Sequence, residues 1–314
     1  MKFRASFVGL AFLLSMIFIM DGSAPEDSSR DPASLSGRRY PHRSLRKSVR
    51  VVTTSPTPPP ADLPILLPED RPHSTLETFK FPLVLMFHDI VATSADQVAG
   101  SDVTESTFKA EMHLLKSRGY TTLSLDELHD AMIGNTVLPE RSVLLTFDDG
   151  YIGSWTYAYP YMKQENMKGA FFVHTNYVGT QTEKLHISWD QLRVISEDPL
   201  FKVMPHTLTH PDLTSLTMDQ LIKEVRDSRA MLELMLGGSH PYFAYPYGRN
   251  GPASISVTRQ YYDMAFVVGT SSPDHRIEAA YQIPRLSMVK TQTVEQFGQA
   301  IQAFSEDPEA NPLR

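Results

Sequence analysis

Two groups of polar residues in this chain have the types and spacing of a catalytic metal site. His206 and His210 are four positions apart, so both can turn to one side of a helix or tight loop and bind one metal ion. Asp148 and Asp149 are adjacent carboxylates, which cannot both be buried and ionised without a positive partner. One carboxylate would then bind the metal, and the other would take a proton from a metal-bound water. Two unrelated histidines and an exposed Asp-Gly turn are the alternatives at this point.

The composition limits what else such a site can contain. The chain has 314 residues, 11 histidines and no cysteine. This excludes a disulfide framework, a thiolate-bound zinc or iron–sulfur cluster and a thiol nucleophile, so any metal must be bound by His, Asp or Glu. The net charge of −7 argues against a general nucleic-acid binder, and we expect no nucleic-acid partner.

Strands and helices alternate from about residue 81 onward, which predicts a parallel sheet, open or closed into a barrel. The predicted strands are residues 83–87, 142–147, 169–173, 202–204, 242–245, 264–268 and 282–286. Phe108, Met112 and Leu115 form one helical stripe, ended by Gly119. Capping boxes predict helix starts at Ser124…Glu127, Thr217…Gln220 and Thr293…Gln296.

Most polar residues that interrupt this pattern come just after a predicted strand. In parallel α/β folds, functional sites form at the C-terminal ends of the strands. We therefore expect four separate segments to converge on one pocket. His174 also follows a strand and could line this pocket, but no motif includes it. The segments are 88–89, 148–150, 206–210 and 247–248.

Three motifs in this order resemble those of polysaccharide deacetylases, the NodB-like domains of the fourth carbohydrate-esterase family. They are residues 146–151 (TFDDGY), 206–213 (HTLTHPDL) and 243–248 (FAYPYG). The resemblance covers about residues 81–304. It implies an α/β fold of the distorted (β/α) barrel type and metal-dependent removal of acetyl groups from N-acetylated sugars.

One branch of this family fits better than the others. Residues 86–90 (MFHDI), 119–128 and 283–285 (IPR) resemble enzymes that partly deacetylate exported poly-β-1,6-N-acetylglucosamine. The expected partner is therefore an N-acetylglucosamine polysaccharide. Deacetylation of peptidoglycan or chitin oligomers and glycan binding without turnover are the alternatives.

The resemblance also implies roles for single residues. Asp148 corresponds to the catalytic base, and Asp149, His206 and His210 correspond to the metal ligands. The backbone N–H of Tyr247 would bind the oxyanion, and its ring would shape the pocket. The expected cofactor is one divalent metal, zinc first, with cobalt, nickel or iron(II) as alternatives.

Two departures from the common family pattern affect the base and the acid. Many relatives have an arginine that steadies the base where this chain has Ala244, and many supply the general acid from a Leu-His motif. The corresponding stretch here, residues 286–288 (LSM), contains no histidine. In the exopolysaccharide branch, the histidine of the early segment takes the role of general acid. The resemblance therefore implies that His88 is the general acid here, and a structural histidine is the alternative.

The N-terminus has the pattern of a targeting segment. Lys2 and Arg4 precede an apolar run over residues 5–20. We read residues 1–24 as a signal peptide or an uncleaved anchor, and residues 25–80 as a disordered linker, first basic and then proline-rich. A deacetylase domain over residues 81–304 and a tail over 305–314 follow. We expect an exported monomer in the periplasm, at the cell surface or outside the cell, with membrane or envelope association through the N-terminus.

Overall fold

The computed structural model describes residues 79–269 and 280–306. The predicted signal or anchor, almost all of the predicted linker and most of the tail lie outside these residues. Within the two described ranges, no helix is long and apolar enough to cross a membrane.

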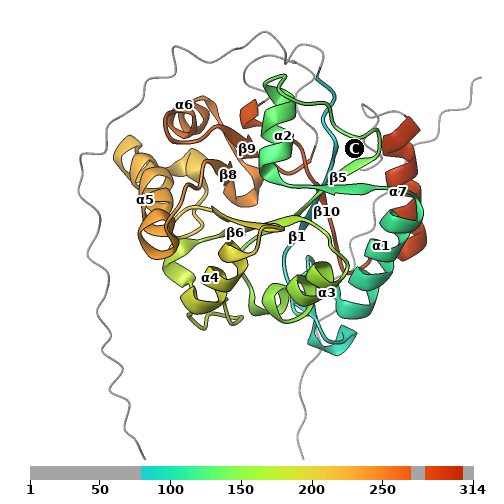
Figure 1. Ribbon diagram of the computed structural model, residues 1–314. Helices are drawn as coiled ribbons and strands as arrows, with labels where there is room; N and C mark the ends of the chain where they lie inside the picture. Colours follow the sequence, from blue (N-terminus) through green and yellow to red (C-terminus); the bar gives the residue numbers. More distant parts are fainter. Residues whose placement is uncertain (1–78, 270–279, 307–314) are drawn as a thin grey trace, which may run out of the picture. The chain divides into compact units, whose positions relative to one another are not determined.

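Parallel strands form the centre of the described part, with helices around them (Figure 1). The main sheet has the order β10-β1-β5-β6-β7, and β4 also pairs with β5. Its strands are β1 (Leu83–Phe87), β4 (Thr121–Leu123), β5 (Ser142–Phe147), β6 (Gly169–Val173), β7 (Phe201–Pro205) and β10 (Leu286–Ser287). Two further parallel pairs are β2 (Ile90–Val91) with β3 (Val103–Thr104), and β8 (Tyr242–Ala244) with β9 (Met264–Phe266).

Three helices begin at the capping boxes that the sequence predicts, including the one at Thr293…Gln296. Capping boxes start α2 at Ser124 and α5 at Thr217, and the apolar stripe of α1 is fully buried. The α-helices are α1 (Glu105–Ser117), α2 (Leu125–Met132), α3 (Tyr159–Gln164), α4 (Trp189–Glu197), α5 (Met218–Leu236), α6 (Pro252–Tyr261) and α7 (Val294–Glu306). Gly119 follows α1 with a φ of 76°, a left-handed conformation that glycine adopts without strain.

The smaller ladders close the sheet into a barrel. β8 contacts β7, and β9 reaches the last strand segment through a bridge between Phe266 and Ile283. Together with the pairing of β10 to β1, this completes the circuit of strands. The predicted distorted (β/α) barrel is therefore confirmed.

The last predicted strand, residues 282–286, is wrong in its bounds. Only Leu286–Ser287 forms a regular strand, and Ile283 makes an isolated bridge. Pro284 lies between them and has no N–H to donate to a ladder. β2, β3 and β4 are also absent from the prediction, because strands of two or three residues are too short to show a period.

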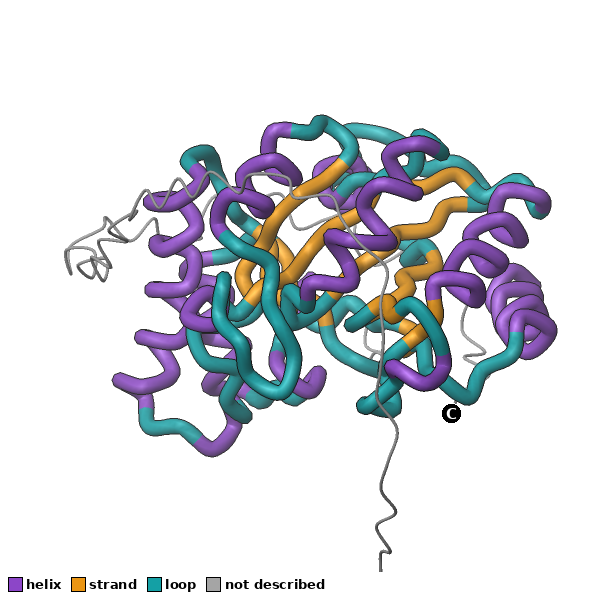
Figure 2. The backbone as a smooth tube through the Cα atoms, turned by 90° about the horizontal axis from the view of Figure 1, so that it is seen from below, coloured by secondary structure: helices purple, strands orange, loops and turns teal. Residues whose placement is uncertain are grey.

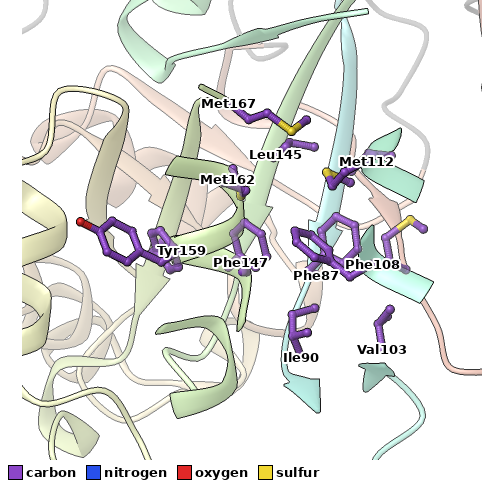
Figure 3. Packing of buried hydrophobic residues seen from close by; sticks show 14 of the residues in the cluster. Phe87, Ile90, Val103, Phe108, Met112, Leu145, Phe147, Tyr159, Met162 and Met167 are labelled. Atoms are coloured by element: carbon purple, nitrogen blue, oxygen red, sulfur yellow. The ribbon is translucent and has the colours of Figure 1, made fainter. Parts of the chain in front are cut away.

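Side chains of the main strands are buried on both faces of the sheet. Leu83, Leu85 and Phe87 belong to one core cluster, whereas Val84 belongs to the other. In the first cluster, the ring of Phe87 stacks on Phe147 and meets Phe108 of α1 edge-on (Figure 3). Burial on both faces explains why these strands read as continuous apolar runs. Figure 2 shows helices on either side of the strands.

Candidate metal and catalytic site

The predicted metal ligands come together at the C-terminal ends of the strands. Asp149 follows β5, His206 follows β7, and His210 lies in the loop after it. The Nε2 atoms of His206 and His210 lie 3.7 Å and 3.4 Å from Asp149 Oδ1. One possible ligand atom from each of the three residues lies within 4.8 Å of the others.

These three residues fit a divalent metal ion. Asp149 Oδ1 is buried and has no hydrogen-bond partner among the described residues. His206 Nδ1 lies 2.7 Å from the carbonyl oxygen of Ala244 and must donate to it, so the Nε2 lone pair faces Asp149. Facing acceptors need a cation between them, and a histidine fixed through its other nitrogen is the usual arrangement around a bound metal.

The backbone is strained where it presents these ligands. Five non-glycine residues in the described part have a positive φ, and four lie at this site: Asp149 (69°), Thr207 (71°), His210 (60°) and Tyr247 (58°). Each such residue costs about 1 kcal/mol or more. Hydrogen bonds hold the loop in place: Thr207 Oγ1 accepts from the His210 N–H, and Glu224 accepts from two backbone N–H groups of the same loop.

Asp148 is held by an arginine from the far end of the chain. Arg285 Nη1 and Nη2 donate to Oδ1 and Oδ2 of Asp148, both at 2.7 Å, and both side chains are buried. Burial alone would raise the pKa of Asp148, but the charge of Arg285, together with its hydrogen bonds, is the main effect that outweighs burial and lowers that pKa to about 2. Asp148 is therefore ionised and carries a fixed orientation, as a base requires.

This role of Arg285 does not follow from the sequence. Arg285 stands out there only within the IPR segment, and position 244, where many relatives have the arginine that steadies the base, is an alanine. The structure supplies the guanidinium from the residue just before β10, while the Ala244 carbonyl orients His206. Arg285 also donates to Val267 O and Thr146 Oγ1. One feature of the sequence could have indicated this role. Arg285 is a charged residue within the predicted strand 282–286, where a buried cation would need a carboxylate partner.

Asp149 has the opposite electrostatic environment. Burial is the main cause that raises its pKa, to about 6, and the charge of Asp148 adds to it. The neighbouring His88 and the Tyr151 hydroxyl act in the lowering direction. Because no arginine within residues 79–269 and 280–306 pairs with Asp149, a bound cation would be its natural counter-charge.

The structure also brings His88 and Tyr247 to the site. His88 follows β1, and a positive charge on it would lower the pKa of both Asp148 and Asp149. Its Nδ1 is buried and without a partner among the described residues. Tyr247 is 58% exposed, and its ring meets His210 at 4.6 Å between centroids. Their roles as general acid and oxyanion donor stay predictions.

His174 does more than line the pocket, because it lies directly beside the predicted metal ligands. Its Nε2 lies 3.7 Å from Asp149 Oδ1, and its ring contacts His210 and His186. Burial, followed by the nearby His206, His210 and His186, lowers the pKa of His174 to about 2, so the ring is neutral. The expectation that it lines the pocket agrees with this position.

Comparison with known proteins identifies the domain. Residues 135–263 match the family model described as polysaccharide deacetylase. The chain carries a polysaccharide deacetylase domain. The predictions of this family and of an enzyme of the deacetylase class are confirmed.

Three relatives show which polysaccharide deacetylases are similar. The putative polysaccharide deacetylase YxkH of Bacillus subtilis is 27% identical over 64% of this chain and 70% of its own length. The poly-beta-1,6-N-acetyl-D-glucosamine N-deacetylase of Escherichia coli K12 is 23% identical over 77% of this chain and 41% of its own. The peptidoglycan-N-acetylmuramic acid deacetylase PdaA of B. subtilis is 29% identical over 43% of this chain and 48% of its own. The chain thus spans less than half of the last two relatives.

A solved structure supports the fold. IcaB from Ammonifex degensii superimposes with a TM-score of 0.61 at 24% identity, covering 70% of this chain and 97% of that one. At this identity, the likeness establishes the fold of the polysaccharide deacetylase domain and not its substrate.

Proposed function

We propose that this polysaccharide deacetylase is a metal-dependent hydrolase that removes N-acetyl groups from an exported polymer of β-1,6-linked N-acetylglucosamine. One observation carries the reaction type: a buried carboxylate, Asp148, is kept ionised by Arg285 beside the cluster of Asp149, His206 and His210. The similarity to a poly-beta-1,6-N-acetyl-D-glucosamine deacetylase supports the substrate.

Each residue at the site has a part in this reaction. Asp149, His206 and His210 hold the metal, zinc being our first choice before cobalt, nickel and iron(II). When bound, such an ion lowers the pKa of water and polarises the amide carbonyl. Asp148 takes the proton of the attacking water, because Arg285 leaves it ionised and oriented.

Two further groups complete the proposed reaction. The backbone N–H of Tyr247 donates to the oxygen that becomes negative as the water attacks. His88 lies near both carboxylates and gives a proton to the sugar amine as the C–N bond breaks. The products are acetate and a free amine on the polymer.

The test is acetate release from a panel of β-1,6 and β-1,4 N-acetylglucosamine oligomers and peptidoglycan fragments. We expect the highest kcat/KM on the β-1,6 oligomers. A preference for peptidoglycan fragments would instead favour the second candidate, which the similarity to PdaA supports. Chelation should abolish the activity and metal add-back should restore it. Full activity in the stripped protein would refute the mechanism.

Two substitutions test the residue roles. Asp148→Asn should abolish acetate release, whereas the control Asp190→Asn, at a side chain that is 95% exposed, should not. His88→Ala should reduce kcat strongly with the metal still bound. Loss of the metal from this variant would make His88 a ligand and not the acid.

We propose that the protein acts outside the cytoplasm, where such a polymer accumulates. The support is the basic and apolar pattern of residues 1–24. Cell fractionation and N-terminal sequencing of the mature protein test this, and a cytoplasmic protein that retains residues 1–24 would contradict it.

A further inference from the structure

A short hairpin over residues 179–187 is attached to the segment that carries the two aspartates. Ile152 N donates to Leu185 O and Ile187 N donates to Gly150 O, both at 2.9 Å. Tyr151 and His186 form an antiparallel bridge between them. The position of this hairpin is therefore tied to that of residues 148–151.

Lys184 lies in this hairpin, and its charged side chain points into the protein. Only 11% of its side chain is exposed, whereas its neighbours Glu183 and Leu185 are exposed. The ammonium group pairs with Asp102, and it lies 3.2 Å from Asp89 Oδ2. It also lies over the ring of Tyr151, 4.7 Å from the centroid.

The partners of Lys184 lead directly to the proposed catalytic groups. Asp89 is the neighbour of His88 in the chain, and the Tyr151 hydroxyl lies close enough to Asp149 to act on its pKa. Asp102 is fully buried, and its Oδ2 accepts from the N–H groups of Val98 and Ala99 at 2.8 Å. One ammonium thus joins the His88 segment, the 98–102 loop and the metal-ligand segment.

We propose that Lys184 is a positioning residue, which holds the His88 segment and the Asp149–Tyr151 segment in register for the reaction. This inference rests on the function proposed above. Without the ammonium, Asp89 and Asp102 would be two buried carboxylates side by side, with no other positive partner in the part of the chain that the structure describes. Their repulsion would separate the segments that they belong to.

The chain contains a control in Lys163, a lysine whose side chain is more exposed, at 56%. This lysine pairs with the buried Asp198 at 2.7 Å and lies over the ring of Tyr159 at 5.5 Å. Lys163 and Asp198 precede β6 and β7, at the edge of the sheet opposite the site. The same kind of contact is therefore available where it holds no catalytic group.

The experiment compares Lys184→Met, Lys184→Arg and Lys163→Met in the full chain. Lys184→Met should lower kcat on N-acetylglucosamine oligomers about tenfold or more with little change in KM, and should lower zinc affinity measured by competition with a chelator. Lys184→Arg should recover most of both values. Lys163→Met should keep wild-type kcat and zinc affinity whatever its melting temperature.

A folded Lys184→Met protein with wild-type kcat and zinc affinity would overturn the proposal. If this variant does not fold, the double variant Lys184→Met/Asp102→Asn removes the excess charge. It should fold because the two carboxylates no longer repel each other, and its zinc affinity should still be low because no ammonium links the His88 segment to the Asp149–Tyr151 segment. Normal affinity there would also overturn the proposal. Should the wild type release no acetate from any substrate, the proposed function fails, while the zinc competition still tests Lys184.

Discussion

Arg285 binds both carboxylate oxygens of Asp148, although 137 residues separate the two positions. Removing the guanidinium would leave a buried carboxylate with a raised pKa. We therefore expect Arg285→Met to lower acetate release on the order of 100-fold and to move the acidic limb of the pH–rate profile to higher pH. Stability should fall by about 3 kcal/mol, because a broken buried pair leaves one charge uncompensated.

Arg193→Met is the control for this variant, because Arg193 lies on the exposed side of α4 and pairs only at the surface. It should keep the wild-type pH–rate profile. An Arg285→Met enzyme whose acidic limb stays at the wild-type pH would show that the pair does not keep Asp148 ionised.

Metal affinity should depend on pH through Asp149. Its pKa is raised to about 6, whereas that of His206 is lowered to about 3, so the carboxyl is the first of the two to bind a proton as pH falls. Protonated Asp149 cannot bind a cation. Zinc affinity should therefore be constant above about pH 7 and fall steadily below pH 6, as measured by chelator competition.

Asp149→Asn provides the comparison for the pH series. It should bind zinc weakly and lack the step near pH 6. Equal affinity of the wild type at pH 5 and pH 8 would argue against Asp149 as the titrating ligand.

Gly153 leaves no room for a side chain. A Cβ there would overlap the carbonyl oxygen of Ile90 and Oδ1 of Asp89, so the segment next to His88 would have to move. Gly153→Ala should lose about 2 kcal/mol of stability and part of kcat. Gly100→Ala is the matched control, since its Cβ meets nothing within 4 Å. Thermal unfolding of both variants checks this, and equal melting temperatures would contradict it.

Glu111 makes stability depend on pH. It is a buried residue of α1, and burial raises its pKa from 4.5 to about 8. Between these values the unfolded chain has lost the proton that the folded protein keeps, so Glu111 destabilises the fold increasingly as pH rises through this window.

Glu111→Gln removes this titration. At pH 8 it should raise the free energy of unfolding by at least about 1 kcal/mol, and near pH 4, below the unfolded pKa, the gain should nearly vanish. Denaturant unfolding at both pH values measures the difference. A gain of the same size at both would exclude ionisation of Glu111 as its cause.

The sequence predicted the features that depend on local pattern. The helix starts follow from capping boxes, and the long strands follow from apolar runs. The polar residues after β5 and β7 meet because parallel strands end at one edge. The sequence therefore predicted that Asp149, His206 and His210 lie together, and the structure agrees. Their roles as metal ligands stay predictions.

The contacts that the sequence did not predict are between distant residues. Arg285 and Lys184 each pair with carboxylates more than 80 residues away, and no spacing rule indicates such a pair. His174 belongs to no motif of the sequence. Its contact with Asp149 follows from its place at the C-terminal end of β6 in the fold. The sequence pattern thus indicated the type of chemistry. The charged residues that support the site could be identified only from the three-dimensional fold.

The pairing of β10 with β1 has a consequence for folding. Leu286 lies beside Leu85, so the sheet joins a strand from the beginning of the described part to one near its end. A growing chain must therefore keep β1 accessible until about two hundred further residues have been made, and such long-range closure slows folding. The segment that matches the family model ends at residue 263, before Arg285. That segment alone would bury Asp148 without its counter-charge, so it should not fold as an independent unit.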